Sequence, residues 1–262
     1  MTNYIINGGK KLKGEITVNA SKNSAVAILL ASLLNDGKTT IINLPKIEEV
    51  FRIIEILESI GVKTVWQGKA LKISPPEKLK LEKLDIEAAL KTRIMILLIG
   101  ILVHKFKKFS LPFSGGCKLG KRTVTPHIYA LEKFGIKIKV KEGEYEISRK
   151  KLVPCENLIM YESGDTATEN AILAASLVGG KTVIKFASAN YQVQDLCHFL
   201  AGLGVNIEGI GTTTLTIFGR ENFNQDYSFR LSEDPIEAMF FLTAAIVTKS
   251  SITIKRCPLD FL

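Results

Sequence analysis

The sequence predicts an α/β fold built from tandem copies of one unit of about seventy residues. A helix that ends in a hydrophobic-Gly-hydrophobic step occurs three times, around Gly61, Gly135 and Gly204. Glycine suits this position because the residue that closes a helix often adopts a left-handed backbone conformation. A predicted strand precedes each of these helices, at residues 39–42, 109–111 and 182–185. The regular spacing of both patterns indicates three copies of the unit.

Each unit is expected to begin with a helix of small and apolar residues. These helices lie at residues 25–34, 93–103 and 169–178. They are rich in alanine, leucine and isoleucine, as is typical of helices that are buried on most sides. A strand, the helix that ends in glycine and two further strands complete the unit. We therefore expect three units around a pseudo-threefold axis, with the small-residue helices packed together inside.

A fourth unit begins near the end of the chain, with a predicted helix at residues 237–247 and a strand at 251–254. The repeat pattern predicts an amphipathic helix after Pro258, yet the sequence stops at Leu262. We therefore expect this chain to be the N-terminal portion of a longer protein.

The best candidate for a domain boundary is the polar stretch at residues 222–227, just before the fourth unit. Residues 22–225 are accordingly assigned to a first domain of three repeats. Residues 1–21 and 226–262 are assigned to a second, truncated domain.

Composition limits the classes of protein that the chain can belong to. With 46% hydrophobic and 23% charged side chains, it is a folded protein rather than a disordered one. The polar segment Gly8-Gly9-Lys10-Lys11 follows the first residues directly, so no secretion signal is recognised. The most apolar stretch, residues 94–103, would span roughly 15 Å as a helix, against a bilayer core of about 30 Å. We expect a cytoplasmic protein without a membrane partner.

The formal net charge of +9 is spread along the chain, without a signature of a nucleic-acid-binding fold. We expect no nucleic-acid partner, and a basic surface also suits anionic, phosphorylated small molecules. The four cysteines form no CxxC pair, and His104, His127 and His198 share no metal-ligand spacing. The histidines are interpreted as structural or surface residues, and no metal site is predicted.

The most distinctive segment is a glycine-rich loop with one cysteine, Gly115-Gly116-Cys117-Lys118. The nearby cations Lys118, Lys121 and Arg122 should favour the thiolate of Cys117 over its thiol. A cysteine in a glycine loop is also compatible with a purely structural role. The cations make Cys117 the candidate nucleophile or proton donor.

Polar and charged residues stand at the starts of the three small-residue helices. Lys22 precedes the first helix, which Ser21 or Asn19 could cap, and Arg93 starts the second. The third begins in the segment 164–170, in which Asp165 or Thr166 could be the N-cap and Glu169 its capping-box partner. Three equivalent helix N-termini would converge on one face and form an anion-binding cleft.

Four segments occur in the order and at nearly the spacing typical of one enzyme family. They are Ser21-Lys22-Asn23, Lys91-Thr92-Arg93, the cysteine loop at 111–123, and Thr166-Ala167-Thr168-Glu169-Asn170. They resemble the Ala-Lys-Asn, Lys-Thr-Met-Arg, Leu-Pro-Gly-Gly-Cys and Gly-Ala-Thr-Glu-Asn motifs of the UDP-N-acetylglucosamine 1-carboxyvinyltransferases, which are enolpyruvyl transferases. The resemblance spans essentially the whole chain, and the cysteine loop is its most specific part.

This resemblance implies an inside-out α/β barrel of two domains, each with three repeats of a βαβαββ-type unit. It implies transfer of enolpyruvyl from phosphoenolpyruvate to the 3-hydroxyl of UDP-N-acetylglucosamine, the first committed step of peptidoglycan synthesis, with release of phosphate. No cofactor or metal is implied. Because the family threads its N-terminal strand into the second domain, residues 4–19 should pair with the tail beyond Tyr227.

The resemblance also implies roles for individual residues. Cys117 would protonate the methylene carbon of phosphoenolpyruvate, which Lys22, Asn23 and Arg122 would bind. The UDP-N-acetylglucosamine contacts would be Arg93, Arg122, Thr123, Val124, Thr125, Pro126, Glu162, Ser163, Gly164 and Asp165. Because the family's remaining units are absent, this chain alone is expected to be inactive and to need the missing C-terminal half.

Two departures from the family pattern bear on the acceptor substrate. The family's Glu-Pro-Glu-Ile-Val-Asp is replaced by the segment Asn190-Tyr191-Gln192-Val193-Gln194-Asp195, and its Asp-Arg-Ile-Glu by Asp234-Pro235-Ile236-Glu237. One alternative is an enolpyruvyl transferase acting on shikimate 3-phosphate, against which Cys117 argues. Another is a half-barrel that binds ligands without catalysis.

Overall fold

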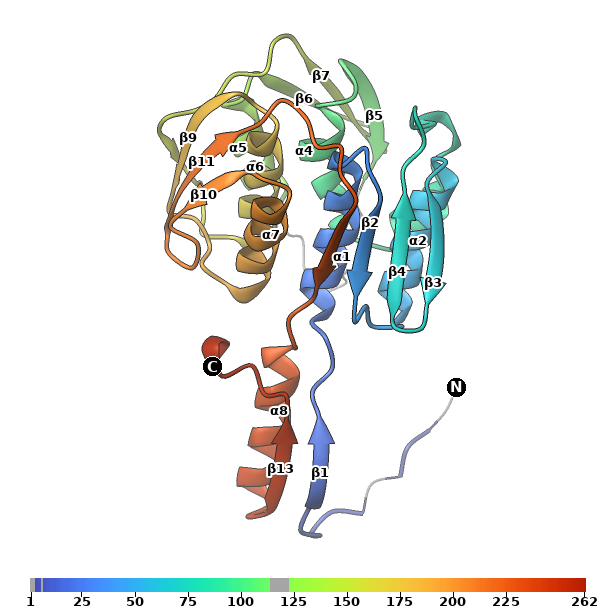
Figure 1. The fold of residues 1–262 in the computed structure, drawn as a ribbon, viewed down its shortest axis with the longest axis vertical. Coiled ribbons are helices and arrows are strands. Elements are labelled where there is room, and N and C mark those ends of the chain that lie inside the picture. Colours follow the sequence, from blue (N-terminus) through green and yellow to red (C-terminus); the bar gives the residue numbers. More distant parts are fainter. Residues whose placement is uncertain (1–2, 6, 114–122) are drawn as a thin grey trace.

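The computed structural model describes residues 3–5, 7–113 and 123–262 and has the predicted α/β architecture (Figure 1). Three small sheets lie around a group of packed helices, and a fourth, two-stranded sheet lies apart from them. The described strands pair within these four separate sheets and do not close into a single barrel.

The three larger sheets share an arrangement of three strands, in the orders β2-β4-β3, β5-β7-β6 and β9-β11-β10, and two of the sheets have one further strand. The first has the order β12-β2-β4-β3 and contains β2 (Thr39–Ile42), β3 (Lys63–Gln67), β4 (Ala70–Ser74) and β12 (Tyr227–Arg230). The second has the order β5-β7-β6 and contains β5 (Lys108–Pro112), β6 (Ile136–Lys141) and β7 (Glu144–Arg149). The third has the order β10-β11-β9-β8 and contains β8 (Leu158–Ile159), β9 (Gly180–Lys185), β10 (Asn206–Glu208) and β11 (Thr214–Gly219).

In each sheet one helix connects the first strand to an antiparallel hairpin, and the second hairpin strand lies in the middle. The connecting helices are α2 (Glu48–Ser59), α5 (Thr125–Glu132) and α7 (Tyr191–Gly202). Gly61, Gly135 and Gly204 all have positive φ angles just after these helices, as their sequence positions indicate. The finer expectation, that the three units superpose about a threefold axis, stays a prediction.

The helices of small and apolar residues form the buried centre of the body. They are α1 (Lys22–Ala31) with η1 (Ser32–Leu34), η3 (Ile94–Leu97) with α4 (Leu98–Leu102), and α6 (Asp165–Ser176). Every residue of α1 from Ser24 onwards is buried. The second predicted helix, at residues 93–103, is divided in the structure into a 3-10 turn, η3, followed by a short α-helix, α4. The other short segments are η2 (Leu81–Lys83), α3 (Ile86–Leu90) and η4 (Leu259–Phe261).

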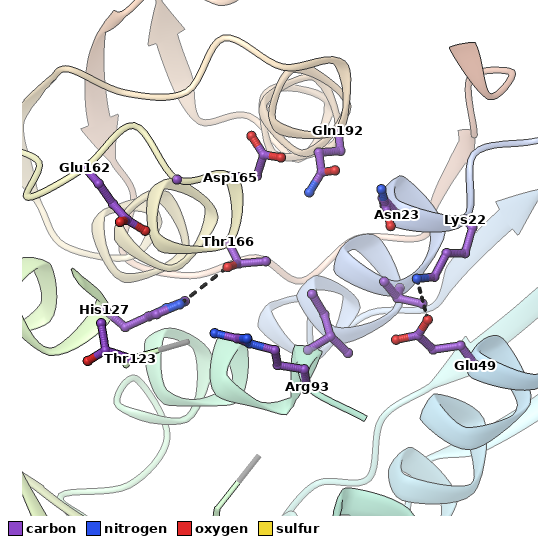
Figure 2. Close-up of a pocket in the computed structure, with 13 residues that line it drawn as sticks. Lys22, Asn23, Glu49, Arg93, Thr123, His127, Glu162, Asp165, Thr166 and Gln192 are labelled. Carbon is purple, nitrogen blue, oxygen red and sulfur yellow. Dashed lines mark hydrogen bonds and ion pairs between the residues drawn. The ribbon is translucent and has the colours of Figure 1, made fainter. Parts of the chain in front are cut away.

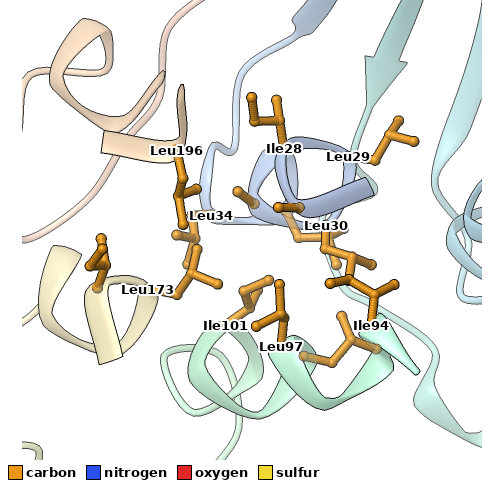
Figure 3. Close-up of a cluster of buried hydrophobic side chains, with 14 of the residues drawn as sticks. Ile28, Leu29, Leu30, Leu34, Ile94, Leu97, Ile101, Leu173 and Leu196 are labelled. Atoms are coloured by element: carbon orange, nitrogen blue, oxygen red, sulfur yellow. The ribbon is translucent and has the colours of Figure 1, made fainter. Parts of the chain in front are cut away.

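Aliphatic side chains from these helices meet in one hydrophobic core (Figure 3). Leu30 of α1, Leu97 of η3, Leu173 of α6 and Leu196 of α7 are all completely buried. Full burial of one such side chain stabilises the fold by about 1.5–3 kcal/mol. This core fixes the ends of α1, η3 and α6 relative to one another.

The two ends of the chain pair outside the body, as predicted. Strand β1 (Lys13–Thr17) runs parallel to β13 (Ser251–Lys255), with Lys13 opposite Ser251 and Thr17 opposite Lys255. Helix α8 (Pro235–Val247) packs beside β13, and Figure 1 shows this small lobe below the body. Strand β12 lies beyond the assigned boundary at residue 225 and still pairs with β2.

Helix α8 exposes large apolar side chains. Ile236, Phe240, Ile246 and Val247 are each between 61% and 70% exposed. Among the described residues, no helix is both long enough and apolar enough to cross a bilayer.

Gly100 of α4 is expected to be required for the close approach of α4 and α6. A Cβ atom at this position would lie 2.6 Å from the main-chain oxygen of Asn170 and would also collide with its side-chain oxygen. We expect Gly100→Ala to lower the free energy of unfolding by about 1–3 kcal/mol, because neither helix can move without disturbing the core. Urea unfolding measures the change. Gly179→Ala is the control, since a Cβ there meets nothing within 4 Å, and equal effects would contradict the packing.

Candidate functional site

A cavity of about 550 Å³ opens where α1, η3 and α6 begin (Figure 2). Its lining is mainly polar and includes Lys22, Asn23, Val26, Glu49, Arg93, Ile94, Thr123, His127, Glu162, Gly164, Asp165, Thr166 and Gln192. The predicted convergence of the three helix starts on one face is therefore present. Helix N-termini favour anions, because their first N–H groups lack partners within the helix and carry partial positive charge.

Lys22 is held at the start of α1 by a carboxylate from α2. Ser21 caps the helix by accepting a hydrogen bond of 3.1 Å from the main-chain nitrogen of Ser24. The Lys22 ammonium group lies 2.6 Å from Oε2 of Glu49. A cation is unfavourable at a helix N-terminus, and Glu49 offsets this cost. The adjacent Asn23 donates its amide to the hydroxyl of Tyr191 at 3.3 Å.

Arg93 stands directly before η3 and points towards the centre of the cavity (Figure 2). In the described part of the chain, no carboxylate lies within 4.0 Å of its guanidinium group. The planar guanidinium group can bind a phosphate or carboxylate through two parallel hydrogen bonds. Arg93 therefore presents a positive charge that no carboxylate of the described chain neutralises.

His127 is a buried neutral imidazole beside Arg93. Burial, and then the charge of Arg93, lower the pKa of His127 to about 4. Asn170 donates its amide to Nδ1 of His127 at 3.2 Å, which leaves the proton on Nε2, 3.4 Å from the hydroxyl of Thr166. Asn170 also accepts a hydrogen bond from the nitrogen of Gly100 at 2.9 Å. One buried amide thus connects α4, α5 and α6 behind the cavity.

The start of α6 differs from its predicted capping. Gly164 is the N-cap, without a side-chain hydrogen bond, so the predicted cap by Asp165 or Thr166 is wrong. Asp165 already belongs to the helix, and its two oxygens accept hydrogen bonds from Ser188 at 2.5 Å and Asn190 at 3.0 Å. These contacts tie α6 to the loop before α7, and sequence spacing does not reveal them.

Glu169 is not a capping-box partner, because it is turned into the interior. Its side chain is fully buried, and Oε1 accepts a hydrogen bond of 3.0 Å from Nε2 of Gln192. Burial, with a further contribution from Asp165, raises the pKa of Glu169 to about 8. At neutral pH the carboxyl group is mainly protonated.

The structure brings together seven of the predicted site residues. Those that line the cavity are Lys22, Asn23, Arg93, Thr123, Glu162, Gly164 and Asp165. Four others do not line it, namely Val124, Thr125, Pro126 and Ser163. Thr125 and Pro126 instead form the first turn of α5, and Ser163 donates to the main-chain oxygen of Ala187. Cys117 and Arg122 lie outside the described residues.

Sequence reasoning missed Glu49, His127 and Gln192 as cavity residues. Glu49 has the pattern of an ordinary first-turn acid in an amphipathic helix, and a lone histidine on α5 gives no signal. Gln192 lies in the segment that departs from the family pattern, which is the one signal that could have identified it. Within the described residues, no group of three or more His, Cys, Asp or Glu side chains is placed to hold a metal ion.

Comparison with known proteins shows the family to which the chain belongs. Residues 6–262 match the family model described as EPSP synthase (3-phosphoshikimate 1-carboxyvinyltransferase). The chain belongs to this family. Two solved structures of similar fold are the enolpyruvyl transferase NikO from Streptomyces tendae and EPSP synthase from Acinetobacter baumannii. Their TM-scores are 0.78 and 0.72, at 21% and 18% identity, and the matches cover 92% and 95% of this chain but 56% of each of theirs.

Curated members of the EPSP synthase family that resemble the chain include UDP-N-acetylglucosamine 1-carboxyvinyltransferases. The protein of that name from Borrelia garinii subsp. bavariensis is 37% identical over 98% of this chain, and that from Endomicrobium trichonymphae is 36% identical over 98%. The matches confirm the resemblance seen in the sequence motifs. The chain spans 59% and 61% of the lengths of these two relatives.

Proposed function

We propose that the chain forms the substrate-binding part of a UDP-N-acetylglucosamine 1-carboxyvinyltransferase. The observation that carries the proposal is the cavity at three helix starts, where Lys22 and Arg93 face polar groups of α6 and α7. Phosphoenolpyruvate and the diphosphate of a sugar nucleotide are both anionic, and two cations at helix N-termini suit such molecules. The identity of the acceptor, UDP-N-acetylglucosamine, is inferred from the names of the sequence relatives.

The reaction in this proposal has two steps. The 3-hydroxyl oxygen of the sugar bonds to C2 of phosphoenolpyruvate, the hydroxyl proton passes to a base, and C3 receives a proton from the Cys117 thiol. The tetrahedral adduct then loses inorganic phosphate, and a proton leaves C3 to restore the double bond. Lys22, Asn23 and Arg122 bind the phosphate and carboxylate of phosphoenolpyruvate during both steps, and the two cations among them need no reorganisation as charge shifts.

The segments on either side of the cavity carry the nucleotide in this proposal. Thr123 of the first segment, residues 123–126, and Glu162, Gly164 and Asp165 of the second, residues 162–165, line the cavity. In this proposal the two segments hold the UDP part of the acceptor, while the sugar points towards Lys22. Arg93 contacts the diphosphate.

The small lobe is proposed to be part of a second domain that also includes residues 1–21. Its helix α8 exposes Ile236, Phe240, Ile246 and Val247, an apolar surface that further chain would cover in a longer protein. Relatives longer than this chain offer such segments. We expect the complete cavity to include groups from them, and catalysis by this chain alone to be absent or slow.

Titration calorimetry tests the proposed ligands directly. UDP-N-acetylglucosamine and phosphoenolpyruvate are titrated into the chain, with shikimate 3-phosphate and single-stranded RNA as alternatives. The proposal predicts saturable binding of the first two and much weaker heat from the others. Preferential binding of shikimate 3-phosphate would move the protein to the other branch of the family, and binding of RNA alone would exclude a transferase.

Alkylation rates are expected to distinguish Cys117 from the other three cysteines. Cys197 is completely buried, and burial raises the pKa of its thiol to about 12, so it should react last. Cys155 and Cys257 are half-buried; Cys155 is followed by the acidic Glu156, whereas Lys255 and Arg256 directly precede Cys257. We expect brief iodoacetamide treatment to label Cys117 at least about tenfold faster than Cys197. Mass spectrometry of tryptic peptides measures the ratio, and equal rates would remove the chemical support for Cys117.

A further inference from the structure

Gln192 is a nearly buried amide that nevertheless lines the main cavity. It belongs to the first turn of α7, and the residue is only 6% exposed. Figure 2 shows it between Asp165 and Asn23, on the side of the cavity opposite Arg93. Close packing leaves the amide few orientations, so its polar atoms have defined directions.

A completely buried acid accepts a hydrogen bond from this amide. Nε2 of Gln192 donates to Oε1 of Glu169 at 3.0 Å, and Oε2 of Glu169 is buried without a hydrogen-bond partner. The neighbouring Asp165 is already occupied by Ser188 and Asn190. Because Glu169 is mainly protonated at neutral pH, it accepts this bond as a neutral group.

The contact with Glu169 uses one N–H of the Gln192 amide. The carbonyl oxygen, a hydrogen-bond acceptor, remains available to a ligand together with the second N–H. Lys22 and Arg93 offer only donors. The cavity thus contains donors for an anion at Lys22 and Arg93, carboxylates at Glu49, Glu162 and Asp165, and a neutral acceptor for a hydroxyl or amide N–H at Gln192.

We infer that Gln192 is a specificity-determining residue that accepts a hydrogen bond from a hydroxyl or amide N–H of the acceptor substrate, and that Glu169 is its positioning residue. The inference rests on the proposed function, because it assigns one part of the same cavity to the sugar. The family pattern has glutamate where this chain has Gln192, so the chain replaces a carboxylate by a neutral amide. A second carboxylate there would lie beside the buried Glu169 and would share its proton or repel it.

The test compares the affinities of two ligands in matched variants. Gln192→Met keeps the length of the side chain but removes the carbonyl oxygen. We expect it to weaken binding of UDP-N-acetylglucosamine at least about tenfold, since a lost hydrogen bond leaves the ligand donor unpaired. Binding of phosphoenolpyruvate should change less than about twofold, because that ligand lies at the cations. Calorimetry measures both constants, and thermal unfolding verifies that the variant is folded.

Glu169 is tested by a conservative pair of substitutions. Glu169→Gln retains an acceptor for Nε2 of Gln192 and should keep the wild-type affinity for UDP-N-acetylglucosamine. Glu169→Met removes that acceptor. It should weaken binding of UDP-N-acetylglucosamine several-fold and leave binding of phosphoenolpyruvate unchanged. If Glu169 had a purely structural role, Glu169→Met would instead weaken the binding of both ligands.

The outcomes separate this inference from the proposed function. Equal affinity of wild type and Gln192→Met for UDP-N-acetylglucosamine overturns the inference and leaves the function intact. An equal loss of affinity for both ligands in Gln192→Met also overturns the inference. If the wild-type chain binds no sugar nucleotide, the proposed function fails, and the inferred contact fails with it.

Discussion

Replacing Lys22 by glutamine is expected to weaken phosphoenolpyruvate binding by about 10- to 100-fold. Lys22 stands at the rim of the cavity, with its ammonium group 2.6 Å from Glu49. A charged hydrogen bond to an anion contributes about 1.5–3 kcal/mol, which corresponds to this range of affinity. The loss should exceed that of any other single lysine in the described part of the chain, because Lys22 is the one of them that lines the cavity.

The matched control is Lys105→Gln. Lys105 forms an ion pair of 2.7 Å with Asp36, comparable to that of Lys22, but it does not line the cavity. Exposed ion pairs contribute little to stability, so both variants should unfold near the wild-type temperature. Calorimetry with phosphoenolpyruvate then isolates the effect on binding, and equal affinities of the two variants would refute an anion site at Lys22.

Glu169→Gln is expected to make the protein more stable than wild type at alkaline pH. The pKa of Glu169 is about 8 in the folded protein, against an ordinary value of 4.5. Between these values the folded state holds a proton that the unfolded state has released. The free energy of unfolding therefore falls by about 1.4 kcal/mol per pH unit as the pH rises from about 4.5 to about 8. Glutamine imitates the protonated acid and removes this dependence.

Urea unfolding of both proteins at pH 5 and pH 9 measures this effect. The wild type should lose on the order of 3–5 kcal/mol more than the variant between the two conditions. The groups that face Glu169 are Asp165 on its own helix, and Gln192 and Cys197 on α7. Both proteins retain Asp165 and Cys197, so the difference reports Glu169. Parallel pH profiles would show that Glu169 is already ionised when folded.

Local sequence signals predicted the features of the fold that depend on neighbouring residues. Glycine after a helix requires only the backbone conformation at that residue, and Gly61, Gly135 and Gly204 have it. The apolar composition of α1 likewise determines its burial. The pairing of β1 with β13 was predicted from the family resemblance, because residues so far apart leave no local signal.

Features that depend on distant partners were not predictable from the sequence. Strand β12 joins β2, although it begins at Tyr227, the last residue of the polar stretch that was chosen as a boundary. The segment 164–170 has the spacing of a capping box, yet Asp165 binds Ser188 and Glu169 binds Gln192. Tertiary hydrogen bonds thus replaced the local ones that the spacing indicated.

In the candidate site, too, local sequence signals predicted some residues, and others depend on distant partners. Charged residues at helix starts, such as Lys22 and Arg93, were identified because a helix N-terminus gives them a common physical setting. Glu49 and His127 reach the cavity from α2 and α5, and only the packing of these helices against the core brings them there. Their place in the site follows from tertiary structure alone.

The central claim is that the cavity at the three helix starts binds the substrates. The most direct measurement is a nuclear magnetic resonance titration of the ¹⁵N-labelled chain with UDP-N-acetylglucosamine, followed by phosphoenolpyruvate. The account predicts amide shift changes concentrated at the starts of α1, η3 and α6, around Asn23, Ile94 and Thr166, and at Gln192 of α7. Changes confined to β1, β13 and α8, or no saturable changes at any amide, would contradict it.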